Sequence, residues 1–361
     1  MGITQLCKPD PSVINAYIRV DGSSVIGSGH LIRCLCVAKY LRSKDIETIF
    51  ITRSENIVQK IEDNGIKVNL LENDYSLDKE LSVIQRLLSK NNRNLMVLDV
   101  NNYNTFKTID AYEYYLKSLG KMPVFTVSFE DHKVHPPLSN IVLLPYAGAG
   151  RLKVDHKKCL YLTGPKYFVL PQIFLKIERA VIRKNVDSLI VSMGGSDPKN
   201  ITIKVLNALN KTKINARLKI ILGGFSKITD GMVKNALDSY KGSFSIVRDC
   251  KNMAEVLSQS DMAIIGSGLT KYEIAFLGLP GLVISNNAYH SSIMDDFVTY
   301  RTVEHLGETD IVKESQIGQA TIHLMNDFER RQDMSEAGKA MIDGLGVERI
   351  FSEVTKEIFD E

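Results

Sequence analysis

The feature that most constrains the fold is the alternation of short apolar runs with amphipathic segments. In the first half of the chain the apolar runs have the character of buried strands, and they lie at residues 16–20, 48–52, 67–71, 95–99, 124–129 and 141–144. Segments with helical spacing of apolar residues separate some of them, at residues 29–43, 54–64 and 77–91. Such alternation predicts a mostly parallel sheet with helices on both faces.

The alternation loosens after Pro145 and then begins again, which indicates a second domain of the same kind. Its strand-like runs lie at residues 187–193, 218–222, 244–247, 262–265 and 281–285, with helical segments at 201–211 and 230–239. A chain of 361 residues with 44% apolar content can fill two cores. We therefore expect an α/β protein of two doubly wound domains, residues 1–165 and 166–361.

A glycine-rich turn joins the first strand to the first helix, and it contains Gly27, Gly29 and His30. Glycine lets a ligand approach the backbone, and the N–H groups at the start of a helix attract anions. Ligands of such folds bind at the carboxyl ends of the strands, where this turn and Asp99 fall. The turn lacks the third glycine of the dinucleotide fingerprint and the lysine of a P-loop. It predicts a phosphate or sugar-nucleotide site with His30 at its mouth, and a plain connecting turn is the alternative.

Two loops in the second half repeat this arrangement of glycine between a strand and a helix. The expected contacts to an anion are Gly194, Gly195 and Ser196 in the first loop and Gly266, Gly268, Leu269 and Thr270 in the second. Glu273 lies one turn into the second helix, where a carboxylate suits the diol of a ribose. Helix capping and compensation of the helix dipole are alternative roles for Glu273 and for Asp197. Glycine loops in both halves favour a diphosphate held between them.

Charge and composition argue against several other classes of protein. The 45 basic and 42 acidic residues are spread along the chain, so we expect no nucleic-acid partner. No apolar run is long enough to span a bilayer, and the N-terminus lacks the apolar core of a signal peptide. The five cysteines are an odd number and show no CxxC pair or metal-ligand spacing, which argues against a disulfide framework. The expected location is the cytoplasm.

One group of side chains has the chemistry of metal ligands, namely Glu130, Asp131, His132 and His135. Its spacing does not fit a helix-borne pair of ligands, and two prolines after it mark a loop. We therefore expect neither a metal nor another cofactor.

Several short motifs occur in a fixed order along nearly the whole chain. They are Arg19-x-Asp21, Gly27-x-Gly29-His30-x-x-Arg33-Cys34, Gly194-Gly-Ser-Asp-Pro198, Glu273 followed by Leu277-Gly-Leu-Pro280, and Asp343-Gly-x-Gly346-x-x-Arg349. In this order they resemble the pseudaminic-acid-pathway UDP-sugar hydrolases and the related spore-coat polysaccharide proteins, the PseG/SpsG family.

The resemblance implies a GT-B-like architecture, in which two doubly wound domains face a central cleft. It places the nucleotide mainly on the C-terminal domain and makes His30 the base that activates water. It implies contacts with the substrate or the nucleotide for the motif residues Arg19, Asp21 and Arg33. It implies the same for Asn287 and His290, which lie in the loop where the family usually has an Asn-Gln pair. Lys271 and His290 are further candidates for contact with phosphates.

The implied function is hydrolysis of a nucleotide-activated deoxyamino sugar, UDP-linked, at the anomeric C–O bond. The reaction proceeds with inversion, without a metal, and releases UDP in nonulosonic-acid or surface-polysaccharide biosynthesis. A GT-B glycosyltransferase and a non-catalytic sugar-nucleotide-binding protein are the alternatives. Residues 127–132 and 287–290 depart from the family pattern, which makes His290 an alternative base and leaves the sugar and the nucleobase open.

Overall fold

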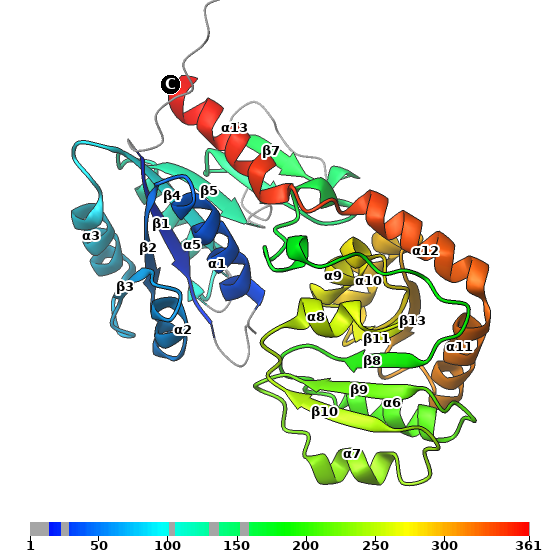
Figure 1. Cartoon of the computed structure of the whole chain (residues 1–361). Coiled ribbons are helices and arrows are strands. Elements are labelled where there is room, and N and C mark those ends of the chain that lie inside the picture. The colour runs from blue at the N-terminus through cyan, green and yellow to red at the C-terminus, as the bar shows by residue number, and fades with distance from the viewer. Residues whose placement is uncertain (1–13, 23–28, 101–104, 130–136, 152–158, 361) are drawn as a thin grey trace, which may run out of the picture. The chain divides into compact units, whose positions relative to one another are not determined.

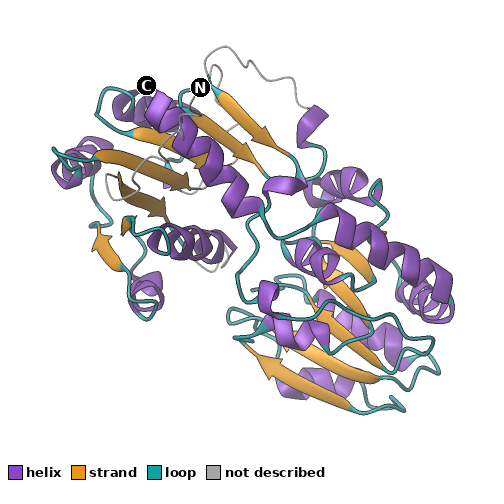
Figure 2. Ribbon diagram, turned by 45° about the horizontal axis from the view of Figure 1, so that its top comes forward, coloured by secondary structure: helices purple, strands orange, loops and turns teal. Residues whose placement is uncertain are grey.

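The chain forms two compact units, shown in Figures 1 and 2. The first contains residues 1–169 and 345–361, and the second contains residues 170–344. The computed structural model describes residues 14–22, 29–100, 105–129, 137–151 and 159–360. Among these residues no helix combines the length and the apolar character needed to cross a bilayer.

The first unit is built on a sheet of seven parallel strands in the order β3-β2-β1-β4-β5-β6-β7. The strands are β1 (Ile14–Val20), β2 (Glu47–Thr52), β3 (Lys67–Leu70), β4 (Arg93–Asp99), β5 (Phe125–Phe129), β6 (Ile141–Leu144) and β7 (Leu160–Thr163). The helices are α1 (Gly29–Arg42), α2 (Val58–Glu62), α3 (Leu77–Leu87), α5 (Ile109–Leu119) and α13 (Gly346–Asp360). The strand order changes direction between β1 and β4, which makes their carboxyl ends the place where ligands bind in doubly wound folds.

The second unit repeats this topology with six parallel strands in the order β10-β9-β8-β11-β12-β13. The strands are β8 (Ser188–Ser192), β9 (Arg217–Leu222), β10 (Phe244–Arg248), β11 (Met262–Gly266), β12 (Gly281–Ser285) and β13 (Glu304–Glu308). The helices are α6 (Ile201–Asn210), α7 (Asp230–Ala236), α8 (Met253–Ser258), α9 (Thr270–Leu277), α10 (Ala288–Val298), α11 (Glu314–Asn326) and α12 (Phe328–Met341). Here the order changes direction between β8 and β11. Two doubly wound domains of this kind confirm the expected α/β class.

Apolar burial explains why these segments form central strands. All described side chains of β11 and β12 are buried, and in β4 all but the first are. A parallel strand covered by helices on both faces reads as a continuous apolar run, which is the pattern that the sequence shows.

The last helix, α13, belongs to the first unit, whereas the sequence analysis assigned it to the second domain. Ile350, Val354 and Ile358 are buried in the same core as α1 and β1. The Tyr40 ring of α1 stacks on the Phe351 ring, with 5.6 Å between centroids. The apolar face of α13 packs against α1, which explains why the chain returns to the first unit after completing the second.

Candidate active site

The carboxyl end of β4 brings together an acid, a base and a cation in the first unit. Asp99 is the last residue of β4, and it pairs in register with Val20 at the end of β1. Because α1 begins shortly after β1, its first turn lies over Asp99. His30 Nδ1 lies 2.6 Å from Asp99 Oδ1, and Arg33 donates from Nε to Oδ2 at 2.7 Å and from Nη2 to Oδ1 at 2.8 Å. The structure therefore joins the predicted residues His30 and Arg33 through one carboxylate.

Asp99 is ionised although it is almost fully buried. Burial alone would raise the pKa of its carboxyl, but the Arg33 guanidinium and His30 outweigh burial and hold that pKa well below its ordinary value. The Arg33 guanidinium also lies over the Phe129 ring, 4.3 Å from the centroid. Packing and two hydrogen bonds thus hold this cation in place, and the carboxylate keeps its charge.

The Asp99 carboxylate orients the imidazole of His30. A carboxylate accepts hydrogen bonds, so Nδ1 carries the proton and Nε2 carries the lone pair of the neutral ring. The His30 side chain is 25% exposed, compared with 1% for Asp99. A partly exposed imidazole held in this tautomer can accept a proton from a bound water, as in hydrolases that pair aspartate with histidine.

Arg19 and Asp21 lie in a buried network at the end of β1. The Arg19 side chain is fully buried, donating from Nη1 to Asp21 at 2.6 Å and from Nε to Glu80 at 2.8 Å. Asp21 also accepts from the backbone N–H of Arg53 at 2.8 Å. The network ties β1 to α3 and to the residue after β2. Contact of either side chain with a ligand stays a prediction, and Gly27 lies outside the described residues.

The first glycine loop of the second unit runs from β8 to α6. Gly194 has a φ of +84°, which favours glycine. A Cβ added at Gly223, beyond β9, would come within 2.4 Å of the Gly195 Cα, so the two loops touch through their backbones. Asp197 accepts hydrogen bonds from the N–H groups of Ile201 and Thr202 at 2.8 and 2.9 Å. Asp197 is therefore a helix cap, the alternative role stated above for this residue.

The second glycine loop runs from β11 to α9 and leads to Glu273. Since β8 and β11 are neighbours, this loop lies beside the first one, and the Gly266 Cβ position is 3.5 Å from the Met193 Cα. Burial raises the pKa of the Glu273 carboxyl to about 7, and a hydrogen bond with Thr270 opposes part of that rise. A desolvated carboxyl at this position can accept hydrogen bonds from a ribose diol.

A third loop, after β12, holds Asn287 and His290. The Asn287 side chain accepts from the His290 N–H at 2.9 Å and so caps α10. Burial and the charge of Lys271 both lower the pKa of His290. His290 thus lies near the second glycine loop, because α9 carries Lys271. Ligand contacts of Asn287, His290 and the loop residues Ser196, Gly268 and Leu269 stay predictions.

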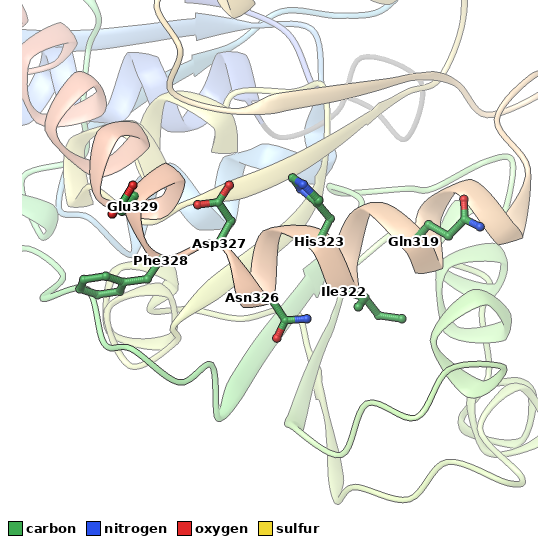
Figure 3. A pocket seen from close by; sticks show the side chains of 7 residues that line it. All are labelled: Gln319, Ile322, His323, Asn326, Asp327, Phe328 and Glu329. Atoms are coloured by element: carbon green, nitrogen blue, oxygen red, sulfur yellow. The ribbon is translucent and has the colours of Figure 1, made fainter.

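A hollow on the second unit lies at the junction of α11 and α12 (Figure 3). Gln319, Ile322, His323, Asn326, Asp327, Phe328 and Glu329 line it. Nearby, Arg331 donates to the carbonyl groups of Arg183 and Lys184, which lead into the amino end of β8. The hollow therefore lies at the amino edge of this sheet, opposite the glycine loops, and contains none of the predicted site residues.

The structure adds partners that the sequence analysis did not identify. Asp99 was expected at this edge of the sheet, but not its pairing with His30 and Arg33, and Glu80 was not singled out. Asp99 can be recognised in the sequence because it is a polar residue at the end of an apolar strand. Among the described residues no group of three His, Cys, Asp or Glu side chains could hold a metal ion. The group at Glu130, Asp131, His132 and His135 lies outside those residues.

The chain has relatives among known proteins. No family model matches the chain. It is 29% identical over 305 residues to the uncharacterized protein MJ1062 of Methanocaldococcus jannaschii, covering 80% of this chain and 59% of that protein. It is 24% identical over 200 residues to the spore coat polysaccharide biosynthesis protein SpsG of Bacillus subtilis, covering 55% of this chain and 58% of SpsG. The alignments thus span about three fifths of the length of each relative.

Solved structures share the fold of both units. MurG of Acinetobacter baumannii superimposes with a TM-score of 0.66 at 11% identity, over 95% of this chain and 99% of MurG. A UDP-GlcNAc 2-epimerase of Neisseria meningitidis, solved with UDP-GlcNAc bound, gives a TM-score of 0.60 at 15% identity, over 94% of this chain and the whole of that one. At such identities the likeness establishes the fold alone, and that fold is GT-B.

Proposed function

We propose that this chain, which is homologous to SpsG and has the GT-B fold, is an enzyme that hydrolyses a UDP-linked deoxyamino sugar. The more general part of the proposal is that the protein processes sugar nucleotides. The name of SpsG, a polysaccharide biosynthesis protein, and the UDP-GlcNAc bound to a protein of the same fold support it. The choice of hydrolysis rests on the first unit.

The hydrogen bond between His30 and Asp99 is the observation that carries hydrolysis. In the proposed reaction, His30 Nε2 accepts a proton from water while the water oxygen bonds to the anomeric carbon. The bond from that carbon to the UDP oxygen breaks on the opposite face, so the configuration inverts. Asp99 stabilises the imidazolium that forms, and Arg33 keeps Asp99 ionised in both states.

The second unit binds the nucleotide in this proposal. Backbone N–H groups of the two glycine loops offset the charge of the departing UDP. Glu273 accepts hydrogen bonds from the ribose. The backbone donors stabilise the negative charge of the departing UDP without a metal cation, so we expect the reaction to proceed without a metal.

Phosphorus NMR of the protein with UDP-, GDP- and CMP-sugars tests the proposal. We expect UDP to appear from a UDP-sugar without an acceptor and at an unchanged rate in EDTA. UDP that appears only when an acceptor is added would identify a glycosyltransferase instead. Sugar nucleotide that binds without turnover would identify a binding protein, and activity lost in EDTA and restored by Mg²⁺ would contradict the metal-free mechanism.

A further inference from the structure

Lys271, the second residue of α9, is buried against the second glycine loop. Its side chain is only 6% exposed. Nζ donates to the carbonyl oxygen of Ser267 at 2.8 Å and to that of Gly268 at 3.2 Å. The ammonium also lies 5.0 Å from the centroid of the Tyr272 ring. A charged group is thus held inside the unit, with two loop carbonyls turned toward it.

The planarity of the peptide bond determines where the N–H groups of this loop point. In a trans peptide the C=O of one residue and the N–H of the next point in opposite directions. Because the carbonyls of Ser267 and Gly268 face Lys271, the N–H groups of Gly268 and Leu269 point away from it. Neither N–H donates to another backbone group among the residues that the structure describes. The loop therefore presents two backbone donors on the face turned from Lys271.

The Ser267 hydroxyl is a third polar group of this loop. Ser267 is only 7% exposed, and its buried Oγ has no hydrogen-bond partner among the described residues. A buried hydroxyl without a partner costs free energy, which a bound acceptor can recover. An anion at the loop would accept from it as well as from the backbone.

We propose that Lys271 is a positioning residue, which holds the second glycine loop in the conformation that binds the diphosphate of a nucleotide. Its ammonium binds the negative ends of two peptide dipoles, so their positive ends, together with the Ser267 hydroxyl, face the phosphate oxygens. This inference rests on the proposed function for the identity of the ligand. It assigns Lys271 an effect on phosphate recognition and none on recognition of the nucleoside.

Lys271→Met tests the inference, because methionine keeps the apolar packing and removes both hydrogen bonds. Calorimetry measures binding of UDP, inorganic pyrophosphate and uridine to the full chain. We expect affinity for UDP and for pyrophosphate to fall about tenfold or more, the effect of one charge-assisted hydrogen bond, with affinity for uridine within about twofold. Lys234→Met, an exposed lysine on α7, controls for the loss of one positive charge.

Ser267→Ala is the second variant, and it leaves Lys271 in place. We expect it to weaken the binding of pyrophosphate and UDP but not the binding of uridine. Unchanged affinity for pyrophosphate in both variants would overturn the inference. An equal loss of affinity for uridine and for UDP would also overturn it. If Lys271→Met does not fold, unchanged affinity for pyrophosphate in Ser267→Ala still overturns the inference, because the inference turns the Ser267 hydroxyl toward the phosphate. A parent protein that binds pyrophosphate and UDP but hydrolyses no sugar nucleotide would contradict the proposed hydrolysis and leave this inference standing. A parent that binds neither would contradict both.

Discussion

Asp99 determines what His30 can do, and its effect is measurable by substitution. In Asp99→Asn an amide replaces the carboxylate, so the proton on Nδ1 is no longer fixed and the imidazolium is no longer stabilised. We expect kcat to fall by roughly 10²–10⁴, as it should in His30→Asn, with UDP affinity nearly unchanged. Single-turnover release of UDP measures the step. Cys34→Ser is the matched control, because the Cys34 thiol donates to the same carboxylate at 3.6 Å and takes no part in the proposed chemistry.

The pH dependence of the rate distinguishes the role of His30 from that of Asp99. The pKa of Asp99 is held well below its ordinary value, so Asp99 stays ionised throughout the range of the assay. The rate should fall with decreasing pH because protonated His30 cannot accept a proton from water. A folded His30→Asn protein that keeps the parent kcat would show that His30 is not the base.

Glu273 should make the protein less stable as the pH rises. Burial raises its pKa from 4.5 to about 7 in the folded state, so between these values the folded protein binds a proton that the unfolded chain releases. At about 1.4 kcal/mol per pH unit, the free energy of unfolding falls by about 3 kcal/mol over that range.

Glu273→Gln should therefore raise the Tm at pH 8 and leave it unchanged at pH 4. Glu273→Ala should weaken UDP binding by about 1–3 kcal/mol, because a hydrogen bond to a charged group is lost. Thermal melts at the two pH values and calorimetry with UDP measure both effects. Glu336→Gln, on the exposed face of α12, is the control. Unchanged UDP affinity in Glu273→Ala would remove Glu273 from the site.

Sequence alone predicted the positions of these residues better than their partners. Glycine loops between strand and helix located His30 and Glu273, since local pattern determines where a helix begins. The partners of Arg19 could not be read in the same way, because Glu80 lies 61 residues away and meets it only through the packing of α3. Asp197 and Asn287 illustrate another limit: one short polar side chain before a helix fits both a cap and a ligand contact.

At the scale of elements, the sequence predicted the central strands of both sheets and the edge strands β3 and β10, but not the edge strands β7 and β13. Buried parallel strands such as β4 and β11 read as apolar runs, and alternation with helices fixes their class. The sequence analysis missed β7, because it lies in the stretch after Pro145 where the alternation loosens. It missed β13, because a partly exposed edge strand such as Glu304–Glu308 carries polar residues. Neither omission affects the predicted site residues, because none of them lies on β7 or β13.

Contact between α9 and α12 depends on a glycine. A Cβ added at Gly338 of α12 would come within 2.6 Å of the Ala275 carbonyl oxygen on α9. Gly338→Ala should therefore displace α9, lower stability by about 1–3 kcal/mol and weaken UDP binding. Urea unfolding and calorimetry measure the two effects. Gly231→Ala on α7 is the control, because its nearest atom is the Thr229 hydroxyl oxygen at 3.8 Å; equal behaviour of both variants would contradict the explanation.

At the scale of the whole molecule, α13 should stabilise the first unit specifically. Ile350 is fully buried in the core that contains α1. Ile350→Ala should lower the free energy of unfolding by about 2–5 kcal/mol. Hydrogen exchange should show the loss in peptides of residues 14–169 and not in those of residues 170–344. Ile322→Ala, 39% exposed on α11, is the control, and uniform loss across both units would contradict this assignment.

The return of the chain to the first unit has a consequence for its synthesis. A ribosome translates all of residues 170–344 after the seven strands of the first sheet and before α13. The second unit can therefore complete its sheet on the nascent chain while the apolar side of α1, with Tyr40, still lacks its covering helix. The unit whose synthesis begins first is thus the one whose synthesis is completed last.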